Sequence, residues 1–183
     1  MKDKLYTIPE LLEERIYTTN DIDNAMLIIH PTAPIYNISP DLAHVFEIGS
    51  NFEQLRNPII DEYGNTYRDS EWYYMAQRTN NLETKKMIAF ISIGKWLAKK
   101  ASKRYDLEQN PEKRVLYMRN AVTQKFTNNP DLEEKLLATG DKEIIEYTAR
   151  NDRLFGIDQE SLTGANALGK LLMEYRNAIL RTI

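Results

Sequence analysis

The chain has 183 residues, 42% of them hydrophobic and 28% charged, which is typical of a single globular domain. No apolar run approaches the roughly 20 residues of a membrane-spanning helix, and the absence of cysteine excludes disulfides, thiol nucleophiles and cysteine-ligated zinc. The net charge of −3 argues against extensive binding to duplex nucleic acid, and because the N-terminus lacks the apolar core of a signal peptide we expect a cytoplasmic protein.

The N-terminal part of the chain predicts one short strand. Residues 26–29, Met-Leu-Ile-Ile, form an apolar stretch of the length and composition of a buried strand. We interpret residues 1–30 as an N-terminal extension packed on the same domain, and residues 31–183 as the domain itself. The sequence contains no internal repeat or low-complexity segment that indicates a second domain.

The next segment predicts a hairpin followed by a helix. Residues 57–67 read as two short strands about a Gly64-Asn65 turn. Asp69 and Ser70 are suitable N-caps for a helix that starts near Glu71, because their short polar side chains accept hydrogen bonds from the first turn.

Three helices are predicted in the middle of the chain. The first covers about residues 82–103, and the second opens with Asn110 as N-cap and Pro111 at its first position. The pair Asn129-Pro130 repeats this start, and Gly140 is expected to end the third helix in a left-handed conformation. The apolar stripe of the second helix follows helical spacing: Val115, Met118, Val122 and Phe126.

The C-terminal part predicts a short strand and a last helix. Ile144-Ile145 indicates the strand, and the helix is expected to begin at Thr163 or Gly164. The residues expected to face inward from that helix are Leu168, Leu172, Tyr175 and Ile179. The fold class is therefore predicted to be α+β, a single and predominantly helical domain with a few short strands.

Glu71 is the first candidate for chemistry. It lies in the first turn of a predicted helix, where the helix dipole favours a charged carboxylate. An ionised carboxylate suits the stabilisation of a positively charged sugar. Glu71, Tyr74, Met75 and Arg78 share one helix face by their spacing. The alternative is a first-turn glutamate that only complements the dipole.

Two further carboxylates are candidates. Asp152 follows Asn151 in a predicted loop, where it either faces a ligand or bonds to its own backbone in a turn. Glu146, flanked by Ile145 and Tyr147, is an acid in an apolar setting. Burial would keep it protonated as a general acid, and the alternative is a strand glutamate that faces solvent.

The predicted start of the last helix is a candidate anion site. Free backbone N–H groups and the helix dipole attract a phosphate there, Gly164 would allow close approach, and Asn166 could add a side-chain donor. Arg176 lies more than two turns further along the helix, so we interpret it as a buried structural arginine that pairs with a site carboxylate.

Lys125 and the segment 50–52 complete the candidate site. Lys125 could neutralise a phosphate, or its amine could attack an electron-poor carbon of a ligand as Schiff-base lysines do, and a surface lysine is the alternative. Ser50, Asn51 and Phe52 provide polar donors beside an aromatic ring for a ribose and a base. No metal or cofactor is expected, because the two histidines, His30 and His44, have no carboxylate at ligand spacing and no Gly-rich phosphate loop is present.

Several motifs occur together in one order. They are Ser50-Asn51-Phe52, Glu71-Trp72-Tyr73-Tyr74 with Ala76-Gln77, Lys125-Phe126, Leu136-Leu137-Ala138-Thr139-Gly140, Asn151-Asp152 with Phe155-Gly156, and Gly164 to Arg176. This pattern resembles the NADAR family, the YbiA-like N-glycosidases, over about four-fifths of the chain. The resemblance implies that Glu71, Asp152 and Lys125 belong to the active site and that Phe155 contacts the substrate.

The chain departs from the family pattern mainly at aromatic positions. Glu53-Gln54 follows the Ser-Asn-Phe element where the family carries Tyr-Pro, Trp72 stands where His commonly follows the glutamate, and Phe155 replaces a Trp. These changes leave the carboxylates in place, so they affect the identity of the base more than the reaction.

The resemblance implies hydrolysis of an N-glycosidic bond between a phosphorylated ribose and a base. The implied substrates are ribosylaminouracil intermediates of the riboflavin pathway or ADP-ribosylated guanine, either as a free nucleotide or in ADP-ribosylated nucleic acid. The alternative is a non-catalytic module that binds ADP-ribose or an NAD derivative. The set of Glu71, Glu146 and Asp152 favours hydrolysis, since binding an anionic ligand gains nothing from several carboxylates. We expect Glu71 and Asp152 to reach a common ligand.

Overall fold

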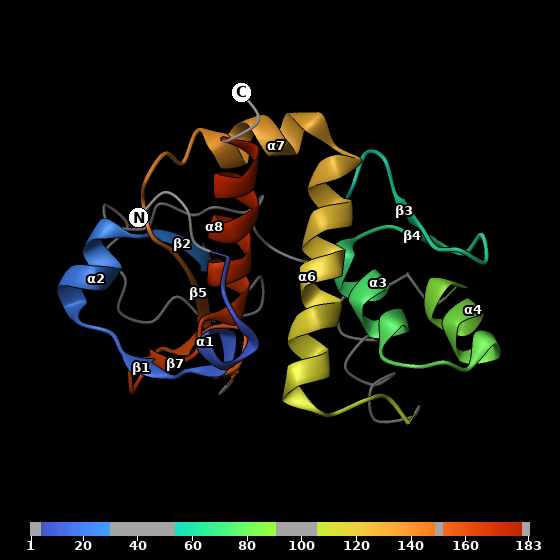
Figure 1. The fold of residues 1–183 in the computed structure, drawn as a ribbon, viewed down its shortest axis with the longest axis horizontal. Coiled ribbons are helices and arrows are strands. Elements are labelled where there is room, and N and C mark those ends of the chain that lie inside the picture. Colours follow the sequence, from blue (N-terminus) through green and yellow to red (C-terminus); the bar gives the residue numbers. More distant parts are fainter. Residues whose placement is uncertain (1–4, 30–53, 91–105, 149–151, 181–183) are drawn as a thin grey trace. The chain divides into compact units, whose positions relative to one another are not determined.

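The computed structural model describes residues 5–29, 54–90, 106–148 and 152–180 (Figure 1). The chain divides into two compact units. Residues 1–50 and 134–183 form the first, which we call the strand unit, and residues 51–133 form the second, which we call the helical unit. The predicted site segment 50–52 and the second half of the helix predicted over residues 82–103 lie outside the described residues.

The strand unit is built on a parallel sheet with the strand order β2-β5-β6. Strand β2 (Met26–Ile29) pairs with β5 (Ile144–Thr148), which pairs in turn with β6 (Ile157–Asp158). The two strands predicted at residues 26–29 and 144–145 are confirmed. The central strand β5 is buried at four of its five positions, as parallel strands covered on both faces usually are.

Two short helices and a second strand pair precede this sheet. Helix α1 (Ile8–Leu12) and helix α2 (Thr19–Asn24) flank β1 (Arg15–Ile16), which pairs antiparallel with β7 (Thr163–Gly164). Both helices begin with a capping box, Thr7 with Glu10 and Thr18 with Asp21. The spacing of these pairs was visible in the sequence and indicates a helix start, but the sequence analysis did not use it.

Helix α8 (Ala167–Ile179) packs on β5 (Figure 1). It begins later than predicted, because Thr163 and Gly164 belong to β7 and Asn166 is the N-cap. Leu168 and Leu172 are buried as expected. A cluster of buried side chains fills the region around β2, β5 and β6: Tyr17, Ala25, Leu27, Ile145, Tyr147 and Ile157.

The helical unit begins with the predicted hairpin. Strands β3 (Ile59–Ile60) and β4 (Thr66–Tyr67) pair antiparallel around a turn in which Gly64 has φ 80°. The carboxylate of Asp61 accepts hydrogen bonds from Tyr63 N, Asn65 N and the Tyr67 hydroxyl. Burial raises the pKa of Asp61, but the hydrogen bonds from Asn65 and its neighbours outweigh burial and lower it overall.

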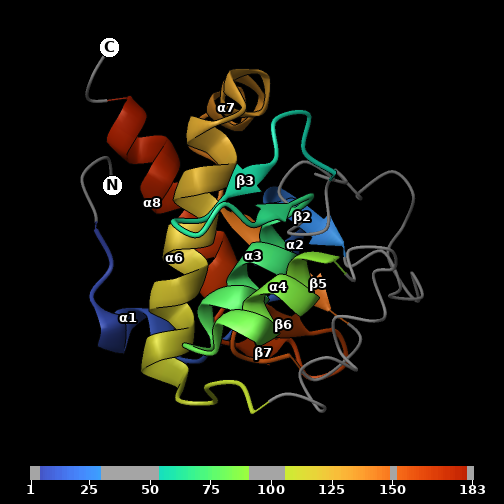
Figure 2. The same ribbon diagram turned by 90° about the vertical axis from the view of Figure 1, so that its right-hand side faces the viewer.

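Three helices make up the rest of the helical unit. Helix α3 (Ser70–Gln77) begins at the predicted N-cap, where Asp69 accepts a hydrogen bond from Trp72 N at 3.0 Å. Helix α4 (Leu82–Phe90) also starts where predicted. Helix α6 (Pro111–Thr127) has Asn110 as N-cap, and its four predicted stripe residues are all buried. Helix α3 packs on α4 and α6 (Figure 2).

Helix α7 (Pro130–Leu137) runs from the helical unit into the strand unit. Gly140, which follows it, has φ 60°, so the predicted left-handed end is confirmed. Helices predominate over the short strands in the described residues, and the predicted α+β class is confirmed. None of the described helices has the length and apolar character needed to cross a membrane.

Candidate active site

In the helical unit, Glu71 lies in the first turn of α3, directly after the N-cap Asp69 and the residue Ser70. Its side chain is half-buried, whereas the five residues that follow it are buried. The location predicted from the sequence is therefore confirmed, and the carboxylate stands where the positive end of the helix dipole favours its charge.

Tyr74 and Arg78 share a helix face with Glu71, as their spacing predicted. The guanidinium carbon of Arg78 lies 5.4 Å from the centre of the Tyr74 ring, and its Nη1 atom lies 3.4 Å from the sulfur of Met75. Burial raises the pKa of Tyr74, the charges of Arg114 and Arg78 lower it, and the nearby Glu71 raises it. Glu71 thus belongs to one electrostatic group with the phenol and the two arginines.

Lys125 is buried, with only 1% of its surface exposed. It lies in the last turn of α6, and its Nζ atom is 5.2 Å from the centre of the Phe126 ring. The alternative of a surface lysine is therefore wrong for this residue. Lysine is rarely buried in folded proteins unless its amine has a defined partner or a chemical task.

Two hydrogen bonds join the helices that carry Glu71 and Lys125. Asn120 of α6 donates to the Tyr73 hydroxyl at 3.2 Å, and Arg114 Nε donates to the Tyr74 hydroxyl at 3.0 Å. Both phenols belong to α3, so these bonds set the rotation of α3 against α6.

The end of α6 is fixed immediately after Lys125. Asn129 is fully buried, and its amide donates to the carbonyl oxygens of Lys125 at 2.8 Å and Asn57 at 3.1 Å. In return Asn57 N donates to Asn129 Oδ1 at 2.9 Å. The backbone turn that holds Lys125 is therefore tied to the segment before β3. The sequence analysis used Asn129 only as part of a helix start and missed this role.

In the strand unit, Glu146 lies at the centre of β5 and is half-buried, so it does not project freely into solvent. Its side chain lies over Gly156, because a Cβ atom added at Gly156 would be 3.2 Å from both Glu146 Cβ and Cγ. Gly156 is the position at which the loop that starts at Asp152 passes beneath this side chain.

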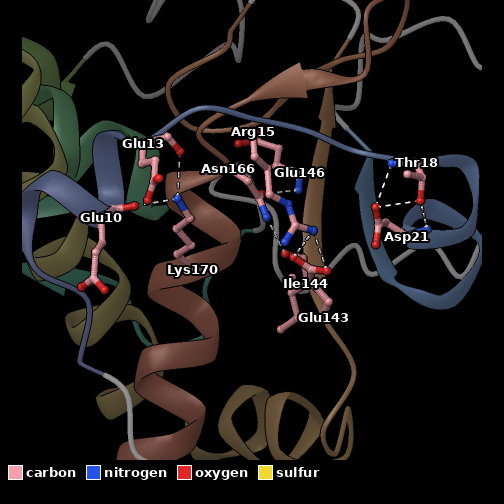
Figure 3. Close-up of polar contacts among 10 residues, drawn as sticks. All are labelled: Glu10, Glu13, Arg15, Thr18, Asp21, Glu143, Ile144, Glu146, Asn166 and Lys170. Atoms are coloured by element: carbon pink, nitrogen blue, oxygen red, sulfur yellow. Dashed lines mark hydrogen bonds and ion pairs between the residues drawn. The ribbon is translucent and has the colours of Figure 1, made fainter. Parts of the chain in front are cut away.

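Asn166 connects β5 to α8 through its side-chain amide. Its Nδ2 atom donates to the carbonyl oxygen of Ile144 at 2.8 Å, and its Oδ1 atom accepts from Glu146 N at 3.0 Å (Figure 3). These are the bonds that a neighbouring strand would make. The predicted role of Asn166 as a donor to a phosphate is replaced by this structural role, since the amide is used by the main chain.

Asp152 forms a turn. Its Oδ1 atom accepts from Phe155 N at 3.2 Å, and its carbonyl oxygen accepts from Gly156 N at 3.1 Å. This is the turn alternative considered for the sequence. The Asp152 side chain is half-buried, whereas Phe155 is buried with 4% of its surface exposed.

Four consecutive carbonyl oxygens of this turn accept hydrogen bonds from the start of α8. The N–H groups of residues 165–168 donate to the carbonyl oxygens of Arg153, Gly156, Leu154 and Phe155, at 2.7 to 3.2 Å. In the anion site predicted over residues 163–166, the N–H groups of Ala165 and Asn166 are therefore already bonded to the main chain. Asp152, Phe155 and Asn166 form one connected scaffold around β5.

Gly164 serves close packing in this scaffold. A Cβ atom there would overlap the Gly156 carbonyl oxygen and lie 2.9 Å from Ile157 Cα. The absence of a side chain at Gly164 is thus explained by the approach of another backbone segment and not by the approach of a phosphate.

The N-terminal residues contact the same scaffold through Tyr17 and Lys170. Tyr17 is buried and its side chain is hydrogen-bonded to Asn166. Arg15 stacks at 3.9 Å on the Tyr17 ring and donates to both carboxylate oxygens of Glu143 at 2.9 Å. Burial raises the pKa of Tyr17 despite the opposing charge of Arg15. Lys170 of α8 also donates to the carbonyl oxygen of Glu10 at 2.6 Å (Figure 3).

Arg176 is buried, as predicted, but its partners differ from the expectation. Its Nη1 atom donates to the Thr139 hydroxyl at 2.6 Å and to the Lys142 carbonyl oxygen at 3.0 Å. In the described part of the chain it therefore fixes the connection from α7 to β5 and forms no pair with Glu146 or Asp152. No group of three or more metal-ligating side chains occurs among the described residues.

The comparisons with known proteins define the class. The sequence profile of the NADAR domain matches residues 42–180. The solution NMR structure of Escherichia coli YbiA superposes with a TM-score of 0.63 at 27% identity, covering 87% of this chain and 88% of that one. The chain belongs to the NADAR domain family.

Curated relatives carry more specific names. A riboflavin biosynthesis protein of Vibrio vulnificus is 32% identical over 148 residues, which are 80% of this chain and 38% of that protein. The chain therefore spans well under half the length of that relative. The N-glycosidase YbiA of Escherichia coli is 33% identical over 63% of this chain and 72% of its own. An N-glycosidase of Nostoc punctiforme is 30% identical over 71% of this chain and 83% of its own. These relatives support the expected enzyme class, a hydrolase of N-glycosyl compounds.

Proposed function

We propose that the protein hydrolyses the N-glycosidic bond between a phosphorylated ribose and a base. The observation that carries this proposal is the burial of Lys125 on a helix that packs against the helix of Glu71. A buried amine and a first-turn carboxylate on two packed helices are groups suited to an electron-poor sugar carbon. The names of the relatives support the same reaction class.

In the proposed reaction the bond from ribose C1 to the base breaks, and its electron pair leaves with the base nitrogen, which takes up a proton. The carboxylate of Glu71 stabilises the positive charge that develops on the sugar. A water molecule adds to C1 and loses a proton, so that the products are the free base and the ribosyl phosphate. In the covalent variant of this reaction, Lys125 Nζ adds to C1 first and water then releases it.

Glu146 and Asp152 stay proposed groups of the reaction on the basis of the family resemblance. Glu146 is half-buried on β5 and suits the protonation of the leaving base. Asp152 uses Oδ1 in its turn, and we assign the orientation of the water to its second oxygen. Ser50, Asn51 and Phe52 stay proposed contacts of the ribose and the base on the basis of their residue types.

The substrates to test are a ribosylaminouracil phosphate of the riboflavin pathway and ADP-ribosylated guanosine. We expect release of free base from at least one of them, measured by chromatography. The Vibrio relative favours the first, because its name places it in riboflavin biosynthesis. Stoichiometric binding of either compound without release of base would contradict hydrolysis and support the alternative, a module that binds ADP-ribose or an NAD derivative.

The role of Lys125 is tested separately from the reaction itself. Sodium borohydride added during turnover would reduce a Schiff base between Lys125 and the opened ribose, and the adduct would be found by peptide mass spectrometry. Lys125→Met is the control, since it keeps an apolar stem of similar length in the buried position. Base release without any adduct would leave the carboxylate-assisted addition of water as the mechanism.

A further inference from the structure

Arg78 is a buried cation whose charge is not compensated by a direct ion pair. It ends α3, and only 6% of its surface is exposed. Its Nε atom donates to the Glu108 carbonyl oxygen at 2.9 Å, and its other close contacts are the sulfur of Met75 and the ring of Tyr74. Among the residues that the structure describes, none pairs a carboxylate with this guanidinium. Buried charges in proteins are normally paired, because their desolvation is costly.

A second arginine approaches the same phenol from α6. Arg114 is half-buried, and its Nε atom donates to the Tyr74 hydroxyl at 3.0 Å. Burial is the main cause that lowers the pKa of Arg78, and the positive charge of Arg114 lowers it further. The planar fork of arginine binds oxyanions through parallel hydrogen bonds, so two guanidinium groups beside one phenol are suited to an oxyanion such as phosphate.

Glu71 and the two arginines are connected through Tyr74, whose pKa responds to the charges of all three. Glu71 and Tyr74 are separated by three residues, or about 4.5 Å along the helix axis. The guanidinium of Arg78 lies 5.4 Å from the centre of the Tyr74 ring. In a ribose 5-phosphate, C1 and the phosphorus atom are only a few covalent bonds apart. Glu71 and Arg114 are half-buried, whereas Tyr74 and Arg78 are buried.

We propose that Arg78 and Arg114 bind the phosphate of the ribosyl substrate, with the hydroxyl of Tyr74 positioning Arg114. Helix α3 then carries both the carboxylate that faces ribose C1 and one of the two cations that hold the phosphate. This inference rests on the proposed function and assigns its phosphate site to the helical unit, in place of the start of α8.

The test is a binding measurement with ribose 5-phosphate and with ribose, by isothermal titration calorimetry. We expect the unmodified protein to bind ribose 5-phosphate more tightly than ribose. Arg114→Gln is expected to lose about tenfold or more in affinity for ribose 5-phosphate and nothing for ribose. Arg78→Lys retains the charge but not the planar fork, so we expect it to lose affinity for ribose 5-phosphate by a smaller factor than Arg114→Gln.

Lys113→Gln is the matched control, because it removes one positive charge from the residue next to Arg114. The Lys113 ammonium pairs with the Glu108 carboxylate at 2.6 Å, and its side chain is exposed. Affinity for ribose 5-phosphate should be unchanged in this variant. Thermal unfolding of Arg114→Gln, which changes a half-buried side chain, verifies that the variant is folded.

Two outcomes would overturn the phosphate site: equal affinities of the unmodified protein for ribose and ribose 5-phosphate, or equal losses for both ligands in Arg114→Gln. Failure of the proposed function gives a different result. A protein that binds ribose 5-phosphate through the arginines but releases no base keeps the phosphate site and contradicts hydrolysis. A protein that releases base equally fast from phosphorylated and unphosphorylated nucleosides supports hydrolysis and contradicts the phosphate site.

Discussion

The strand unit and the helical unit both carry polar motif residues, but the two sets are bonded differently. In the strand unit, Asn166 and Asp152 bond to backbone N–H and carbonyl groups of β5 and of their own turn. In the helical unit, Arg78 and Arg114 contact the ring and hydroxyl of Tyr74, and one guanidinium nitrogen of Arg78 bonds to the main chain, at the Glu108 carbonyl oxygen.

This difference distinguishes side chains that hold the fold together from side chains that are available to a ligand. A side chain that bonds to the main chain has its donors and acceptors used before any ligand arrives, and its loss mainly affects folding. A group of charged side chains on one helix face keeps its capacity to respond to a ligand charge. Variants of the strand unit should therefore change stability more than turnover, and variants of the charged face should do the opposite.

The largest effect is expected from Gly164→Ala. The new methyl group would overlap the Gly156 carbonyl oxygen, and neither backbone segment can move away without breaking its bonds. We expect a loss of about 3 kcal/mol in the free energy of unfolding, measured by urea denaturation. Gly64→Ala is the comparison, because it has no atoms within 4 Å and carries only the cost of its positive φ, about 1 kcal/mol. Equal losses in the two variants would contradict the crowding argument.

Glu71→Gln probes the charged face. The amide keeps the size and hydrogen bonding of the side chain but removes the charge that, in the proposed reaction, stabilises the developing sugar cation. Turnover should fall about a hundredfold, equivalent to about 2.7 kcal/mol, while substrate affinity changes little because the ribose is neutral in the ground state.

The control for this variant is Glu83→Gln, which removes a first-turn glutamate from α4. Glu83 is exposed and pairs with Lys86 at 3.0 Å, so turnover should not change. Near-normal turnover in Glu71→Gln would show that the central residue of the proposed reaction has been assigned wrongly.

Asn166→Ala should weaken the scaffold by a smaller amount. It leaves the Ile144 carbonyl oxygen and the Glu146 N–H group without their partner at a buried position. We expect a loss of about 2 kcal/mol in the free energy of unfolding, with turnover per folded molecule reduced far less than in Glu71→Gln. Asn24→Ala in α2 removes an exposed amide and should be nearly neutral. A loss of turnover without a loss of stability would instead support the predicted role of Asn166 in binding the substrate.

Asp61 sharpens the comparison, because it is a scaffold residue within the helical unit. In the folded state its pKa is lowered below the usual aspartate value of about 3.9, so its charge stabilises the fold above that pH and the contribution is lost as the pH falls below it. Asp61→Asn should thus be less stable than the unmodified protein at neutral pH, by about 1 kcal/mol. The difference between the two should shrink in urea titrations at about pH 3. A difference that does not depend on pH would exclude the charge as its cause.

The features predicted correctly from the sequence are those determined by neighbouring residues. Asp69, Asn110 and Gly140 work through hydrogen bonds or φ angles within a few residues of their own position, so the local sequence is enough to place them. The apolar stripe of α6 was predictable for the same reason, because helical periodicity is a property of the helix alone.

The errors occurred where distant segments compete for the same backbone groups. The start of α8 was placed at residue 163 or 164 because a Thr-Gly pair is a reasonable helix opening. In the fold these residues pair with Arg15 and Ile16 of β1, a partner about 150 residues away in the chain, and the helix begins only after Asn166. The anion site was predicted at the same residues, and its N–H groups are instead bonded to the turn that Asp152 forms.

By itself, the sequence indicated the family and the positions of Glu71, Lys125 and the other candidate residues along the chain, and it led to the proposed reaction class. Only the tertiary structure decided that Lys125 is buried, that Asn166 serves the backbone of β5, and that Arg78 and Arg114 share Tyr74. The physical reason is that residue type and spacing set what a side chain can do. Burial and bonding partners depend instead on segments that meet only when the chain is folded.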